Sequence, residues 1–396
     1  MMPEENHSLS RRDFVRVSMF STAGFTIMNT ESALGTNANS AMAVGIIGCG
    51  GRGNHDATNF RRHTNSRITA LADPYSDRLE STKQNFKSDD PKTFQGFDAY
   101  EKLLATDVDT VIMTSPPYFH PEHFEAAVEA RKHVYLEKPI AVDTVGAKRV
   151  LKAGENADGT LSVMVGFQIR FSPDMVEAVK RVHEGAIGAI VCGQGHYHSG
   201  WLSPRHKPGM SEQEKRIRNW VFDIVLSGDI LVEQNIHVLD VFNWIMGTHP
   251  VKAYGTGGRK IRTAVGDTWD HYGVTLWYPD NVEVVFASTQ FLDLGWGDAG
   301  ERFNGSKGAF DALVGPAKIR GENQWSFEGT PGDAEELKIK AFYDSVAAKK
   351  YVNEIPQGVE ATLTAIMGRT ASYRKVEYTW EDMLKENEQF DAKLNL

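Results

Sequence analysis

A glycine-rich turn directly after a short β-branched segment constrains the fold more than any other feature of this chain. Residues 43–47 predict a buried strand, and Gly48, Gly50 and Gly53 follow it with the spacing G-x-G-x-x-G. The first glycine permits a tight turn, the second lets a pyrophosphate approach the backbone, and the third lets the next helix pack closely on the strand. Free backbone N–H groups at the start of that helix then face the phosphates. The pattern predicts a dinucleotide site.

The next predicted strand ends in a carboxylate where a dinucleotide fold needs one. Residues 67–72 read as a strand, and Asp73 lies about 20 residues after Gly53. A carboxylate there accepts hydrogen bonds from the adenosine ribose and repels a 2′-phosphate, which favours NAD and makes NADP the less favoured cofactor. The alternative is a helix cap, because Pro74 and a polar helical stretch follow Asp73.

Strands and helices alternate through the first part of the chain. Strand-like runs at 108–113, 133–136 and 161–165 are separated by helical segments at 122–130 and 143–155. This alternation predicts an α/β fold with a doubly wound parallel sheet, in which ligands bind beyond the carboxyl ends of the strands.

Composition excludes several classes of protein. The chain has 396 residues, enough for two domains, and a net charge of −9 without a Lys/Arg run, so we expect no nucleic-acid partner. Two cysteines, Cys49 and Cys192, exclude a disulfide scaffold and a cysteine-built zinc site. No apolar stretch reaches the ~18 residues that a bilayer span needs, so we expect no membrane segment in the mature form.

The first 41 residues have a different character. Ser10-Arg11-Arg12-Asp13-Phe14 is followed by a charge-free stretch at 17–30 that is rich in Ser and Thr. This order resembles a twin-arginine export signal, the route that carries folded proteins across the inner membrane. We therefore expect the twin-arginine machinery as a partner and a periplasmic location. The alternative is a disordered arm in which two arginines adjoin by chance.

Two further motifs point to a family. Glu137-Lys138-Pro139 directly follows a predicted strand, and the block 228–240 runs from small residues through an acid to His237 and Asp240. Together with the glycine motif, Asp73 and the loop 114–117, these motifs resemble the glucose–fructose oxidoreductase/inositol dehydrogenase (Gfo/Idh/MocA) family. The resemblance covers nearly all of the chain after the leader.

The resemblance implies two domains after a leader at residues 1–41. An NAD-binding Rossmann domain occupies 42–165, and an α/β domain with a large open, mainly antiparallel sheet occupies 166–396. Alternating runs at 271–277 and 281–289, separated by a turn signal, fit strands of that sheet. An open sheet must cover its outer face, so we expect a homodimer or homotetramer formed through it.

Lys138, Glu233 and His237 are the predicted catalytic residues. Lys138 follows a buried strand at the ligand edge, and the resemblance gives it a catalytic or orienting role; the alternative is a solvated surface charge. Glu233 and His237 lie four residues apart on one predicted helix, where the imidazole accepts a hydroxyl proton and the carboxylate orients it; the alternative is a core histidine with local partners. A metal held by these two with His196 and His198 is disfavoured, since nicotinamide accepts the hydride directly, and we expect no metal.

The other predicted site residues fall into two groups. The cofactor-binding group lies on loops after the Rossmann strands and comprises Gly48, Gly50, Gly51, Arg52, Gly53, Asp73, Arg78, Ser115, Pro116, His120, Glu137 and Lys138. The substrate group combines aromatic faces with polar groups, as sugars require, and comprises Arg170, His198, Trp201, Trp220 and Asp240. The alternative for each substrate residue is packing or an oligomer interface.

The resemblance implies an NAD-dependent oxidoreductase acting on a secondary alcohol of a sugar, polyol or glycoside. Since we expect no free nicotinamide pool in the periplasm, an exported enzyme would hold its cofactor tightly and regenerate it in place. Either a second sugar is reduced, or one substrate is oxidised and reduced again around an elimination or epimerisation, as in NAD-dependent glycosidases. A sensor that holds a dinucleotide without turnover is the non-enzymatic alternative, against which Lys138 and His237 argue.

Overall fold

The structure, a computed structural model, describes residues 41–292 and 297–396, which belong to one compact unit, Ala41–Leu396. The predicted export leader lies outside the described residues, apart from Ala41. Within the described ranges, no helix has the length and apolar character that a bilayer crossing requires.

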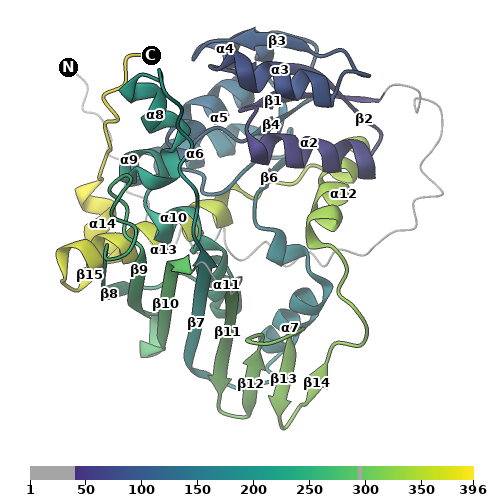
Figure 1. Cartoon of the computed structure of the whole chain (residues 1–396). Coiled ribbons are helices and arrows are strands. Elements are labelled where there is room, and N and C mark those ends of the chain that lie inside the picture. The colour runs from purple at the N-terminus through teal and green to yellow at the C-terminus, as the bar shows by residue number, and fades with distance from the viewer. Residues whose placement is uncertain (1–40, 293–296) are drawn as a thin grey trace, which may run out of the picture. The chain divides into compact units, whose positions relative to one another are not determined.

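Six parallel strands form the first sheet, in the order β3-β2-β1-β4-β5-β6 (Figure 1). The strands are β1 (Met42–Ile47), β2 (Ser66–Asp73), β3 (Lys92–Gln95), β4 (Thr110–Met113), β5 (His133–Leu136) and β6 (Val163–Val165). The connecting helices are α2 (Gly51–His63), α3 (Ser76–Asn85), α4 (Ala99–Leu104), η2 (Pro117–Phe119), α5 (His120–Glu129) and α6 (Thr144–Ala157). The predicted doubly wound parallel sheet is confirmed. The sequence did not predict β3, because this short edge strand is mostly exposed and has no apolar alternation.

Nine strands form the second sheet, in the order β14-β13-β12-β11-β7-β10-β9-β8-β15. Only the β7–β10 pair is parallel among its recorded pairings, so the predicted open, mainly antiparallel sheet is confirmed. The strands are β7 (Ile190–Gly200), β8 (Lys252–Gly258), β9 (His271–Trp277), β10 (Glu283–Leu292), β11 (Asp298–Gly305), β12 (Gly308–Asp311), β13 (Lys318–Gly321), β14 (Trp325–Ser326) and β15 (Tyr378–Thr379).

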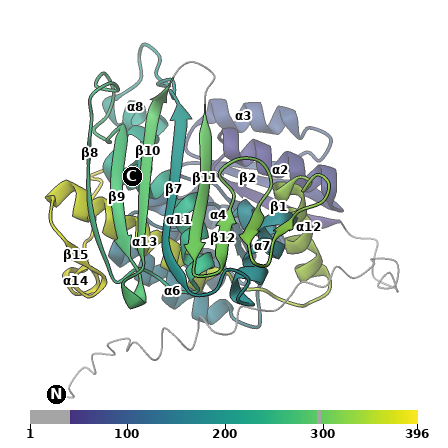
Figure 2. The ribbon, with the colours of Figure 1, turned by 90° about the horizontal axis from the view of Figure 1, so that it is seen from below.

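Helices cover one face of the second sheet, and Figure 2 shows the broad sheet with α11 and α13 behind it. The remaining helices are η3 (Gln168–Phe171), α7 (Pro173–His183), α8 (Glu212–Arg218), η4 (Trp220–Phe222), α9 (Ile224–Ser227), α10 (Ile230–Glu233), α11 (Ile236–Met246), η5 (Pro279–Asn281), α12 (Ala334–Ala347), α13 (Ile355–Arg374) and α14 (Trp380–Glu386). No helix among the described residues covers the other face of this sheet, as Figure 2 shows.

Helix α12 packs against the first sheet although it follows the second in sequence (Figure 1). Phe342 on α12 makes edge-on ring contacts with Phe60, 5.8 Å between centroids, and with Tyr135, at 5.7 Å. All three rings and Ile339 are buried in one apolar cluster with β1 and α2. Residues 334–347, which the sequence places in the second domain, thus contribute to the core of the first.

Glu301→Gln is expected to stabilise the protein at pH 8 but not at about pH 5. Burial raises the pKa of Glu301 from 4.5 to about 8, and the nearby charge of Asp174 adds to the shift. Above pH 4.5 the unfolded chain releases this proton while the folded protein keeps it, so the free energy of unfolding falls as the pH rises to 8. A neutral amide removes that loss, on the order of a few kcal/mol. Urea unfolding of the variant and the parent at both pH values tests this. The same difference in free energy of unfolding at the two pH values would contradict it.

Candidate active site

The glycine motif forms the turn from β1 into α2. Gly48 has a φ of +96°, and a Cβ there would come within 2.7 Å of backbone atoms of Thr114 and Ser115, so the turn closely approaches the loop after β4. A Cβ at Gly53 would lie 2.2 Å from the carbonyl oxygen of Gly48. Backbone packing alone therefore demands the first and third glycines of the motif.

Gly53→Ala is expected to destabilise the protein much more than Gly51→Ala. The Gly53 Cβ collides with backbone that cannot give way, and overpacking of this kind costs about 1–3 kcal/mol or more. A Cβ at Gly51 meets nothing within 4 Å. The free energy of unfolding of Gly51→Ala should therefore lie within about 1 kcal/mol of the parent value. Thermal unfolding of the two variants checks the pair, and equal losses would contradict the close packing at Gly53.

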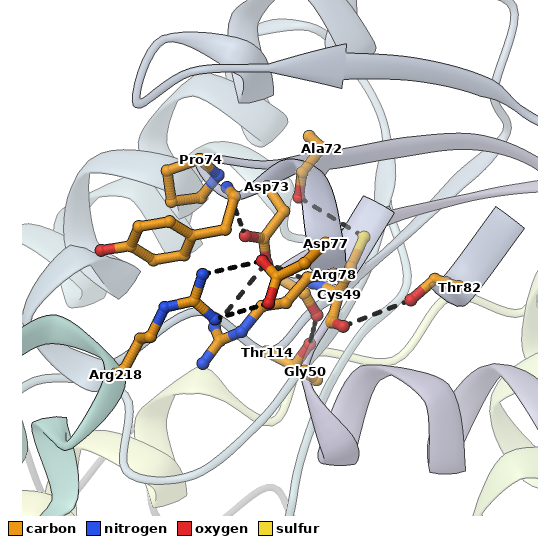
Figure 3. A network of polar contacts seen from close by, with 12 residues as sticks. Cys49, Gly50, Ala72, Asp73, Pro74, Asp77, Arg78, Thr82, Thr114 and Arg218 are labelled. Carbon is orange, nitrogen blue, oxygen red and sulfur yellow. Dashed lines mark hydrogen bonds and ion pairs between the residues drawn. The ribbon is translucent and has the colours of Figure 1, made fainter. Parts of the chain in front are cut away.

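Asp73 ends β2 and lies beside the glycine turn, as Figure 3 shows. Its Oδ2 accepts the N–H of Cys49 and its Oδ1 the N–H of Tyr75, each at 2.9 Å, and Arg78 Nη1 is 3.8 Å from Oδ2. Burial raises the pKa of this carboxyl, and the charge of Arg78 opposes the shift. Helix α3 has Tyr75 rather than Asp73 at its N-cap. Each carboxylate oxygen keeps a lone pair for a ligand hydroxyl.

A cavity of about 600 Å³ lies beside this turn. Of the predicted cofactor residues, Gly50, Gly51 and Arg78 line it. The same cavity is lined by second-domain residues that the sequence did not single out, among them Arg205 and Lys207. No local spacing relates those residues to the glycine motif, so only the fold brings the two groups together.

A second cavity, of about 220 Å³, is lined by the three predicted catalytic residues and by several predicted cofactor residues. Its lining comes from the glycine turn, the loops after β4 and β5, and the segments around α10 and α11. The lining residues are Arg52, Thr114, Ser115, Pro117, His120, Glu137, Lys138, Gln168, Trp220, Glu233 and His237. The three predicted catalytic residues therefore share one cavity with predicted cofactor residues.

Glu233 holds the ammonium of Lys138. Lys138 Nζ donates to the backbone oxygen of Glu233 at 2.6 Å and to its Oε1 at 3.1 Å. An ammonium has three N–H groups, so one remains for a ligand oxygen. The prediction that one helix carries Glu233 and His237 is wrong, because Glu233 ends α10 and His237 lies in the first turn of α11. Glu233 consequently contacts the lysine, and the recorded bonds of the described chain give it none to the imidazole.

His237 presents a neutral imidazole to the cavity. Its ring lies edge-on to Phe167, with 6.2 Å between centroids, and its Nδ1 has no hydrogen-bond partner among the described residues. Burial, and after it the charge of Lys138, holds the pKa of His237 well below its ordinary value of 6.5. The low pKa keeps the ring uncharged, and an uncharged imidazole is available to accept a proton.

Three carboxylates engage Arg52, which was predicted to bind cofactor. Its guanidinium lies 2.9 Å from Glu137 Oε1, 3.1 Å from Asp56 Oδ1 and 3.0 Å from Glu335 Oε1. Glu335 belongs to α12, so the helix that packs into the first core also reaches this site. The network fixes Glu137, which directly precedes Lys138.

His120 joins the loops that follow β4 and β5. Its Nδ1 lies 2.7 Å from the carbonyl oxygen of Pro139 and its Nε2 lies 2.8 Å from that of Ser115. Burial lowers the pKa of His120 to about 4. These backbone contacts position the Lys138 loop, and the neighbouring Pro116 lines neither cavity.

Of the predicted substrate residues, Trp220 lines the smaller cavity, and the other four line neither cavity. Arg170 and Asp240 pair with each other at 2.8 and 2.9 Å, so the fold itself uses both charges. His198 Nδ1 lies 3.1 Å from Thr289 Oγ1 on the second sheet, and Trp201 follows β7. Within residues 41–292 and 297–396, no group of three or more His, Cys, Asp or Glu side chains is arranged to hold a metal ion.

Two family models match the chain. Residues 42–167 match the model described as "Oxidoreductase family, NAD-binding Rossmann fold", and residues 175–311 match the "GFO/IDH/MocA C-terminal domain". Inositol 2-dehydrogenase 4 of Saccharopolyspora erythraea is 29% identical over 211 residues, which are 53% of this chain and 55% of that protein. Inositol 2-dehydrogenase of Rhizobium meliloti is 25% identical over 322 residues, which are 80% of this chain and 87% of that protein.

Solved structures share the fold. A crystal structure described as a putative myo-inositol dehydrogenase from Sinorhizobium meliloti 1021 aligns with a TM-score of 0.64 at 22% identity, covering 85% of this chain and 99% of that one. The aldose-aldose oxidoreductase of Caulobacter crescentus aligns with a TM-score of 0.69 at 18% identity, covering 86% of this chain and 100% of that one. At these identities the likeness establishes the architecture.

Proposed function

This chain belongs to the Gfo/Idh/MocA family of NAD-dependent oxidoreductases acting on CH–OH groups, and from that premise we propose that it oxidises a secondary alcohol of a sugar, polyol or glycoside. Inositol 2-dehydrogenases among its relatives support a polyhydroxylated substrate. The observation that carries the proposal is that Lys138 and His237 line one cavity beside the glycine turn.

The residues at the turn fit NAD. Gly50 and Gly51 leave open space where a pyrophosphate approaches, since a Cβ at Gly50 would meet only Arg78, at 4.0 Å. The first turn of α2 carries no acidic side chain, and Asp73 keeps lone pairs for ribose hydroxyls. The same carboxylate disfavours a 2′-phosphate and so NADP.

Two side chains divide the chemistry at the alcohol. NAD, when bound, accepts the hydride that leaves the carbinol carbon. Lys138 donates its remaining N–H to the substrate hydroxyl oxygen and stabilises the negative charge that develops there. His237, neutral near pH 7, takes the hydroxyl proton, so the C–H electron pair and the O–H proton leave together and a ketone remains. Glu233 and Arg52 hold these groups in position.

We also propose that the protein is exported with NAD already bound. The support is the twin-arginine pattern at Arg11 and Arg12, since that route carries folded proteins. An enzyme separated from a nicotinamide pool needs a closed cycle, either with a second sugar as oxidant or with one substrate that is oxidised and reduced in turn.

One experiment separates these reactions. Protein purified from the periplasm of expressing cells is denatured, and released nicotinamide is quantified by mass spectrometry. About one NAD(H) per chain supports the carried cofactor, and an empty protein contradicts it. The intact protein is then given NAD with inositols, aldoses and aryl glycosides. NADH formation supports a dehydrogenase, and oxidation of one sugar with reduction of a second supports the two-sugar cycle. Aglycone release without net NADH supports the glycosidase alternative, and none of these with any substrate contradicts the proposal.

We propose that the open sheet forms a homodimer or homotetramer. Adjacent strands place Tyr254, Thr275, Val285 and Gln194 in one row on this sheet, and Tyr254 and Val285 are exposed there. Burial of such a row favours association of two copies. Sedimentation equilibrium checks the state, and a monomer at micromolar concentration contradicts it.

A further inference from the structure

The larger cavity draws part of its lining from beyond the Rossmann domain. One part is the glycine turn with α3 residues, and the other is residues 204–207 and Met210 together with Arg218 at the end of α8. Residues 204–210 connect β7 to α8 and are called the basic loop here, because they include Arg205, His206 and Lys207.

Positive charge dominates this lining. Four lining side chains are cations and one is a carboxylate, namely Arg78, Arg205, Lys207, Arg218 and Asp77. Arg205 and Lys207 are exposed, and the ion pairs recorded within the described ranges do not involve them. An unpaired cationic surplus around a cavity favours an anionic ligand.

Arg218 links the two parts of the lining. Its Nη2 and Nη1 contact the two oxygens of Asp77 at 2.7 and 3.1 Å, its Nε donates to Glu214 at 2.8 Å, and its guanidinium lies 4.0 Å from the ring centroid of Tyr75. Figure 3 shows this arginine reaching from the second-domain ribbon to Asp77, near Arg78 and Asp73. Asp77 and Tyr75 belong to the segment that follows β2, so Arg218 contacts the chain close to Asp73, where the adenosine ribose is expected.

Asn219 fixes the basic loop beside this arginine. Its Oδ1 accepts the N–H of Arg205 at 2.5 Å, and its Nδ2 donates to the carbonyl oxygen of the same residue at 3.0 Å. Asn219 is buried and directly follows Arg218. The loop and the end of α8 therefore form one cationic surface facing the cavity that Gly50 and Gly51 line.

We propose that the basic loop and Arg218 complete the binding site for the adenosine–pyrophosphate half of the dinucleotide and govern how slowly it leaves. This inference rests on the proposed function in taking NAD as the ligand. Backbone N–H groups of the glycine turn would hold the doubly negative pyrophosphate together with the charges of Arg205 and Lys207, which line the same cavity. Arg218 holds the second-domain side of the cavity against Asp77. Dissociation then requires this contact to open.

The test measures dissociation of NADH and ADP-ribose from the whole protein by stopped-flow displacement. R205A/K207A and R218A are each expected to release both ligands about tenfold faster or more. The first variant removes hydrogen bonds to the pyrophosphate, and the second removes the contact of Arg218 with Asp77. ADP-ribose lacks nicotinamide, so equal factors for both ligands assign the effect to the shared half. The rate for the parent protein is expected to rise with salt, and R205A/K207A should reduce that dependence.

The control K152A/K385A removes the same number of charges from exposed positions that line neither cavity, and is expected to leave the rates unchanged. Rates within twofold of the parent in R205A/K207A, with thermal unfolding unchanged, would overturn the inference. R205A/K207A changes two exposed side chains, so it remains informative if R218A fails to fold. A parent protein that binds neither ligand would overturn the proposed function itself, whereas binding without any change in the variants overturns the inference alone.

Discussion

Lys138→Met is expected to lower kcat by about 10³-fold, in the range that loss of a positioned proton-handling group produces. Among the residues that the structure describes, Lys138 supplies the one ammonium that lines the smaller cavity, and the change leaves the substrate oxygen without this donor. It also leaves the Glu233 carboxylate without the partner now at 3.1 Å. Because the interaction strengthens as charge develops on oxygen, kcat should fall much more than the KM for the substrate rises.

Steady-state kinetics with the best alcohol from the substrate panel, together with NADH titration, measure this effect. NADH affinity should stay within about tenfold of the parent, as one charge-assisted contact at most is lost. Lys152→Met is the matched control, since that lysine is exposed on α6 and lines neither cavity. A kcat within threefold of the parent would exclude Lys138 from the chemistry.

His237→Asn is expected to lower kcat/KM by about 10²–10⁴-fold and to remove the acidic limb of the pH profile. A base acts only when unprotonated, and the pKa of His237 lies well below 6.5 because of burial and the charge of Lys138. As pH falls, the parent enzyme should therefore keep its activity through 6.5 and lose it only at lower pH. The low pKa weakens the base but keeps it available in mildly acidic medium.

Rates from about pH 4 to pH 9, with stability checked at each value, test the assignment. Lys138→Met removes the charge that acts most strongly on the imidazole and so raises the pKa of His237. The residual activity of that variant should therefore fall off at a higher pH than that of the parent as the medium is made more acidic. His63→Asn, at the end of α2 and away from both cavities, is the control. A His237→Asn variant with an unchanged acidic limb would assign the proton to another group.

Short-range sequence patterns predicted most of the architecture. The glycine spacing and the position of Asp73 reflect steric and hydrogen-bonding demands within one turn and two strands, so the sequence expresses them directly. The break between α10 and α11 was missed because Glu233 and His237 have helical spacing. Asn235, at the N-cap of α11, was the available signal.

Long-range pairings were beyond such patterns. Lys138 and Glu233 are 95 residues apart, and Arg52 and Glu335 are 283 residues apart. Only the assembled fold decides which charges meet. Glu233, which the sequence predicted to orient His237, contacts Lys138 instead. For the same reason Arg170 was predicted to contact a ligand, although its charge is matched by Asp240.

Helix α12 determines when the dinucleotide domain can mature during protein synthesis. Its residues leave the ribosome long after the six strands of the first sheet, yet Phe342 closes the aromatic cluster around Phe60 and Tyr135. A nascent chain lacking α12 exposes that apolar surface and offers it to chaperones. Its Glu335 also arrives late at Arg52. The core of the dinucleotide domain is therefore complete only once residues 334–347 have been synthesised.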